Sequence, residues 1–181
     1  LSVVIALSGI LLSTSDRIQI KHLLEKGDYF LGIYSVNYQL YSYSVDLLVG
    51  IFFLYIPNYL YVKYERYGID SYMEGLAYVL ELYIVCSTFL VMIIMCSYGA
   101  INYIVFDSVY AQQSKLSLYI VSGQYYFGIY LVLSNYFTVV NKKVVITCLM
   151  LFFGIANVVL NFIFIPIYGY IFAAISTLFS Y

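Results

Sequence analysis

Charged residues are missing from three long stretches of this chain. Residues Leu82–Phe106, Leu116–Asn141 and Val144–Tyr181 contain no Asp, Glu, Lys or Arg. A soluble domain does not carry such runs, because each of its helices needs a solvated polar face. Each run exceeds the roughly 20 apolar residues with which a helix crosses the hydrocarbon core of a bilayer. The absence of charge therefore predicts an integral, multi-pass membrane protein.

The scarcity of other residue types excludes several classes of protein. The formal net charge of −1 offers no basic surface, so we expect no nucleic-acid partner. The three cysteines lie within apolar runs, and the single histidine, His22, has no ligand-type residue at metal-binding spacing. We therefore expect no disulfide framework and no metal site. No nucleophile, phosphate-loop or paired Cys/His motif is present, so we expect no catalytic residues, no cofactor and no enzyme activity.

Tyrosine is abundant in this chain, and tryptophan is absent. The chain has 24 Tyr and no Trp. Tyrosine anchors helices at both membrane interfaces, and its ring also stacks on the face of a sugar. A coding sequence rich in A and T raises the tyrosine content in the same way. Composition alone does not separate these three interpretations.

The apolar pattern predicts an all-α polytopic membrane bundle of about six helices. The expected helices are Leu1 to at least Ser13, Tyr29–Ile56, Gly75–Tyr98, Leu116–Val140, Val144–Ile165 and a sixth that begins near Tyr170. Pro57 is expected to end the second helix, and Pro166 with Gly169 to form a tight turn. Residues Asn58–Glu74 are expected to form a solvated loop or an amphipathic segment on the membrane surface. We read 1–181 as one transmembrane domain that is truncated at both ends.

Polar side chains form a stripe on the second expected helix. Ser35, Gln39, Ser42 and Asp46 follow one another at i, i+4, i+7 and i+11, within roughly 60° of arc at 100° per residue. Asn37 lies outside the stripe. Such a stripe faces either a water-filled cavity or a neighbouring helix to which it hydrogen-bonds. We predict a cavity.

Two further groups of polar residues lie in or beside the apolar runs. Asp16 and Arg17 form either the start of a loop or a pair inside the membrane that faces the same cavity. Asn157 and Asn161 are one helical turn apart on the fifth helix, where hydrogen bonding between helices is their default role.

Two motifs together point to a known family. The stretch NVVLNFIFIPIYGYIFAAISTLFSY begins at Asn157 and contains Leu-Asn, Ile-Pro, a Gly turn and Ala-Ala before Ser176 and Thr177. Upstream, Ser15–Ile18 reads Ser-Asp-Arg-Ile and Gly32–Ser35 reads Gly-Ile-Tyr-Ser. Both motifs, in this order, resemble those of the polysaccharide-biosynthesis flippases, which transport O-antigen and capsule repeat units. These belong to the multidrug/oligosaccharidyl-lipid/polysaccharide (MOP) exporter superfamily and are related to the MATE transporters.

The resemblance implies a fold and a function. The chain would be the second lobe, helices seven to twelve, with its first helix extended through Asp16 and Arg17 along a central cavity. Its substrate would be a polyprenyl-diphosphate-linked oligosaccharide, moved from the inner to the outer leaflet of the bacterial plasma membrane. Arg17 would contact a phosphate, and Asp16 or Asp46 would bind a coupling proton or Na⁺. The family order also predicts that Asn58–Glu74 and Asn141–Lys143 lie on the cytoplasmic side.

Two other functions remain open from the sequence. A cation-coupled multidrug exporter of the same superfamily would have a more apolar cavity with fewer basic groups. A membrane-embedded glycan polymerase would need catalytic acids and a large loop outside the membrane, which the chain does not have. Membrane lipids are expected partners in every case.

Overall fold

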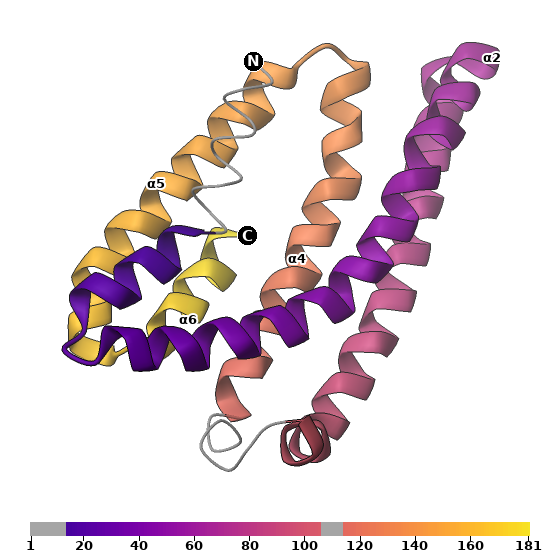
Figure 1. Cartoon of the computed structure of the whole chain (residues 1–181). Coiled ribbons are helices and arrows are strands. Elements are labelled where there is room, and N and C mark those ends of the chain that lie inside the picture. The colour runs from indigo at the N-terminus through magenta and orange to yellow at the C-terminus, as the bar shows by residue number, and fades with distance from the viewer. Residues whose placement is uncertain (1–13, 106–113) are drawn as a thin grey trace.

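The protein is built from helices alone in the part of the chain that the structure describes. The computed structural model describes residues 14–105 and 114–181, which are 94% helical and contain no strand (Figure 1). The elements are a helix over residues 14–23, α2 (Gly27–Val105), α4 (Ser114–Val139), α5 (Lys143–Tyr168) and α6 (Ile171–Ser180). Three helices, in α2, α4 and α5, are long and apolar enough to cross a membrane. The predicted all-α class is confirmed, and the expected helix Leu1–Ser13 lies outside the described residues.

The longest element, α2, is a hairpin of two helical arms. Gly68 interrupts the helix with φ 81° and ψ −169°, a conformation that a residue with a side chain rarely adopts. The first arm rises to this residue and the second descends from it (Figure 1). Each arm is longer than the roughly 20 residues that a membrane crossing needs.

The hairpin corrects two expectations from the sequence. Pro57 does not end the second helix, because α2 continues through it to Gly68. Residues Asn58–Glu74 are therefore neither a loop nor a separate amphipathic segment, but the tip of the hairpin. An apolar environment explains the difference. A proline inside a helix loses one backbone hydrogen bond, whereas an irregular loop would leave several backbone groups unpaired in lipid.

The C-terminal helices follow the sequence prediction closely. Asn141, with φ 56°, forms the tight turn between α4 and α5. Gly169, with φ 77°, ends α5 and donates its backbone N–H to the Ile165 carbonyl at 2.8 Å. Pro166 lies in the last turn of α5 rather than beyond it. The expected turn between the fifth and sixth helices is confirmed.

Helix α4 packs against both α2 and α6, while α5 packs chiefly against α6. One apolar core lies between the α2 hairpin and α4 and includes Tyr72, Tyr83 and Val132. A second core includes Ile20 of the 14–23 helix and Ala173 of α6. The reversals at Gly68 and at Asn141 lie at the same end of the molecule (Figure 1).

Candidate functional site: a polar cavity beside a buried aspartate

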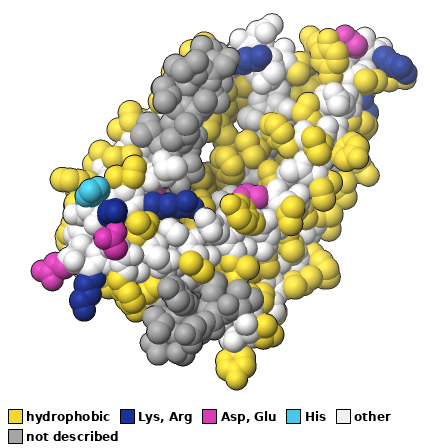
Figure 2. All heavy atoms as spheres, in the orientation of Figure 1, with side chains coloured by type: hydrophobic (Ala, Val, Ile, Leu, Met, Phe, Trp, Pro, Cys, Tyr) yellow, Lys and Arg dark blue, Asp and Glu magenta, His cyan; other side chains and the backbone are white. Residues whose placement is uncertain are grey.

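Several segments of the chain converge on one cavity of about 250 Å³, which we call the polar cavity. It is lined by Arg17 of the 14–23 helix, Tyr38, Gln39, Ser42, Tyr43 and Asp46 of α2, Gln124 and Phe127 of α4, Met150 of α5, and Tyr181. Figure 2 shows a hollow near the middle of this face, with acidic and basic side chains beside it. Four of the six residues predicted for the site, Arg17, Gln39, Ser42 and Asp46, thus line the same space.

Arg17 lies in the wall of the cavity, beside the ring of Tyr38. Its guanidinium carbon lies 5.4 Å from the centre of the Tyr38 ring, within the range of a cation–π contact. Its Nε is buried and has no hydrogen-bond partner, and no described carboxylate lies within 4 Å of its side chain. The cation therefore keeps an unused donor beside the cavity.

Three of the four residues of the polar stripe on α2 line the cavity, and the fourth does not. Gln39 and Asp46 are exposed and Ser42 is buried, and all three line the cavity. Ser35 is half-buried and is not among the lining residues. Asn37, which lies off the stripe, is fully buried and donates to the backbone carbonyl of Ile33 at 2.9 Å. The helical periodicity thus separated the residues that line the cavity from the one that does not, except at Ser35.

Asp16 forms no ion pair with Arg17 within 4 Å and instead belongs to a buried cluster of hydrogen bonds. Its Oδ2 accepts from the Tyr34 hydroxyl at 2.8 Å and from the Thr177 hydroxyl at 2.7 Å. Its Oδ1 accepts from the Asn161 amide at 2.9 Å. A buried carboxylate is expensive to desolvate unless such donors surround it. The donors come from α2, α5 and α6, so Asp16 ties the 14–23 helix to three other elements.

Two more residues complete this cluster, which we call the Asp16 cluster. The Asn157 amide lies 3.2 Å from the Thr177 hydroxyl and 3.2 Å from the Asn161 amide. Ser176 donates to the Asn161 side-chain oxygen. All six side chains, Asp16, Tyr34, Asn157, Asn161, Ser176 and Thr177, are at most 4% exposed. These side chains form one continuous network of buried hydrogen bonds.

The two motifs that are far apart in the sequence meet in this cluster. Asp16 belongs to the Ser-Asp-Arg motif, whereas Asn161 and Thr177 belong to the C-terminal motif. No protein-family model matches this chain, and no curated protein or solved structure matches it either. The similarity to the flippases therefore stays a prediction that depends on these motifs and on the geometry around them.

Sequence reasoning missed three residues beside Arg17. Gln124 lines the cavity and donates to the Tyr38 hydroxyl at 3.2 Å, while its own side-chain oxygen is buried without a partner. Tyr38 and Tyr181 form part of the wall. No local signal identified them, because Gln124 is one polar residue in an apolar run and the tyrosines are two of 24. The cavity as built offers one cation, one carboxylate, uncharged hydrogen-bonding groups and aromatic rings.

Proposed function

We propose that this chain is one lobe of a bacterial plasma-membrane flippase for a polyprenyl-diphosphate-linked oligosaccharide. The observation that carries the proposal is Arg17, a cation beside the polar cavity with no described carboxylate within 4 Å of it. An intramembrane charge without a partner is expensive, and such residues usually serve a ligand. The aromatic contact with Tyr38 stabilises the cation in the absence of that ligand.

The chemistry of the cavity fits both parts of such a head group. The guanidinium of Arg17 presents a planar fork that binds two phosphate oxygens at once. Gln39, Ser42 and Gln124 offer uncharged donors and acceptors of the kind that sugar hydroxyls use. The ring of Tyr38 or Tyr181 adds a flat face for a sugar. The lipid tail of the substrate would stay in the bilayer.

The Asp16 cluster is the better of the two predicted positions for a coupling ion. Asp46 is exposed and no described residue hydrogen-bonds to its carboxylate, whereas Asp16 is buried and accepts hydrogen bonds from Tyr34, Asn161 and Thr177. A proton on Asp16, or a small hard cation such as Na⁺ at its carboxylate, would occupy this buried position. The bound cation would neutralise the buried carboxylate. Because the cluster joins four helical segments, occupancy by a cation would alter how tightly they pack.

One observation favours a second function, the cation-coupled export of organic cations. Asp46 and the rings of Tyr38, Tyr43, Phe127 and Tyr181 would suit a positively charged aromatic compound. Arg17 would repel such a substrate. The two proposals therefore make opposite predictions for the loss of Arg17.

An export assay with three variants tests the proposal. Arg17→Ala is expected to abolish export of the lipid-linked glycan at an unchanged amount of protein in the membrane. Arg17→Lys should retain part of the activity, because an ammonium binds phosphate as a point charge only. Arg66→Ala, at the exposed hairpin tip, removes the same charge and should have no effect. If Asp16→Asn/Arg17→Gln restores export, the two residues are a dispensable pair and the assignment is wrong. Increased drug export by Arg17→Ala would favour the second function.

A further inference from the structure

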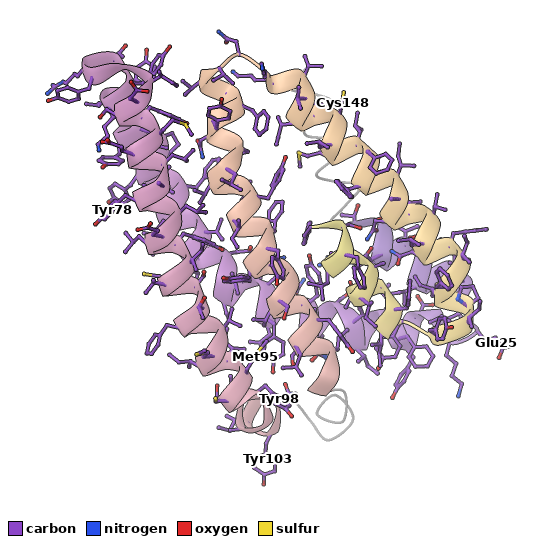
Figure 3. All side chains as sticks on the ribbon, turned by 180° about the vertical axis from the view of Figure 1, so that it is seen from behind. Glu25, Tyr78, Met95, Tyr98, Tyr103 and Cys148 are labelled. Atoms are coloured by element: carbon purple, nitrogen blue, oxygen red, sulfur yellow. The ribbon has the colours of Figure 1, made fainter. Side chains whose placement is uncertain are left out.

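A second and larger concavity lies on the outer side of the α2 hairpin. It has a volume of about 940 Å³ and is lined by residues of both arms, from Ile51 to Lys63 on the first and from Tyr78 to Cys86 on the second. We call it the outer groove. Tyr78 points away from α4 (Figure 3), so the groove opens on the face opposite the one that α4 covers. Its walls are almost entirely apolar or aromatic, and Lys63 is the one charged residue among those that line it.

Lys63 is fixed at the end of the groove nearest the hairpin tip. Its aliphatic stem lies against Gly75 of the second arm, where a Cβ would come within 2.9 Å of the Lys63 Cδ. Its ammonium lies 5.3 Å from the centre of the Tyr59 ring. No described carboxylate lies within 4 Å of that ammonium. The groove thus ends in a positioned cation that forms no ion pair with a described carboxylate.

The groove has the dimensions of one membrane leaflet. From Ile51 to Lys63 the first arm advances by about 18 Å at 1.5 Å per residue. One leaflet contributes about half of the roughly 30 Å hydrocarbon core, which is about 15 Å. Charged side chains gather at the tip of the hairpin above an apolar surface (Figure 2), as expected where a helix leaves the lipid. Lys63 therefore lies at head-group level, and the apolar walls extend over the depth of the acyl chains.

We propose that the outer groove binds an anionic phospholipid, with one acyl chain between the arms and the phosphate at Lys63. The transported substrate is a less suitable occupant, because α2 separates this groove from the polar cavity between α2 and α4. A zwitterionic lipid would place the same chain in the groove without a net charge to attract Lys63. The inference depends on the membrane assignment but not on the flippase function.

A tryptophan reporter tests this lipid site directly, since the chain has no natural Trp. Leu82→Trp places the indole in the groove wall, and Phe152→Trp places it on the exposed face of α5 as a matched control. Each variant is reconstituted in bilayers that contain brominated phosphatidylglycerol or brominated phosphatidylcholine, which quench a Trp that they contact. The relative affinity of the two lipids is read from the quenching at equal bromine content.

Quenching of the groove reporter is expected to show about a fivefold preference for phosphatidylglycerol, the factor that one basic residue at an anionic head group provides. Quenching of the α5 reporter should show little preference for either lipid. Lys63→Gln in the Leu82→Trp background should remove the preference, whereas Lys63→Arg and the exposed control Arg66→Gln should keep it. An unchanged preference for phosphatidylglycerol after Lys63→Gln would overturn the proposal. Absence of quenching by both lipids would also overturn it, because another protein surface would then cover the groove.

Discussion

Replacing Asp16 with Asn exchanges one carboxylate oxygen for an NH₂ group in the buried Asp16 cluster. Asp16 Oδ2 accepts from Tyr34 and Thr177, and Oδ1 accepts from Asn161. An amide has one oxygen only, so in either orientation its NH₂ group faces at least one donor. Leaving a buried donor without an acceptor costs about 1–3 kcal/mol. Removing the buried charge offsets part of this, so we expect a net loss of about 1–2 kcal/mol of stability.

Thermal unfolding of the purified protein in detergent measures this loss. For a chain of this size, 1–2 kcal/mol corresponds to a decrease in Tm of about 2–8 °C. Asp46→Asn is the matched control, because Asp46 is exposed and should change stability by less than about 0.5 kcal/mol. In a double-mutant cycle with Thr177→Val, the two positions should couple by about 0.6–1.7 kcal/mol. An Asp16→Asn protein as stable as the wild type, with no coupling to Thr177, would refute the cluster as a stabilising unit.

Two further predictions concern packing and solvent access. A Cβ at Gly128 would overlap the Tyr83 hydroxyl, so Gly128→Ala should destabilise the protein by about 1–3 kcal/mol in the same unfolding assay. Gly123→Ala is the control. Its Cβ would meet only ordinary contacts, so this variant should be neutral or slightly stabilising. In a cysteine-free background, Gln39→Cys should react with a water-soluble thiol reagent, because Gln39 lines the polar cavity. Asn37→Cys should not react, because Asn37 is buried. Equal reactivity at both positions would show that the polar cavity does not hold water.

The sequence contained most of the helical layout because charge-free runs and turn residues are local signals. Gly169 formed the expected turn, and α4 and α5 matched their expected ranges within three residues at each end. The helix end predicted at Pro57 was wrong, because the local effect of proline on the backbone is outweighed by the lack of any alternative hydrogen-bond partner in an apolar environment. The single-residue break at Gly68 gave no stronger signal than any other glycine.

The candidate site was predictable only where one helix carried it. Helical periodicity placed Gln39, Ser42 and Asp46 together, because 100° per residue fixes which side chains share a face. The partners of Asp16 could not be found in this way. Tyr34 lies 18 residues along the chain, whereas Asn161 and Thr177 lie 145 and 161 residues away, and contacts between helices depend on packing that no local pattern encodes.

Equilibrium binding measures whether Arg17 contacts a phosphate of a lipid-linked glycan, as proposed. The purified protein is titrated with a polyprenyl-diphosphate-linked oligosaccharide and with a neutral analogue that has the same lipid and sugars but no phosphate. Hydrogen bonds to a charged group contribute about 1.5–3 kcal/mol, so Arg17→Ala should weaken binding of the diphosphate compound by roughly 10- to 100-fold. The same variant should bind the neutral analogue as the wild type does. Equal affinity of the wild type and Arg17→Ala for the diphosphate compound would show that Arg17 does not bind the phosphate.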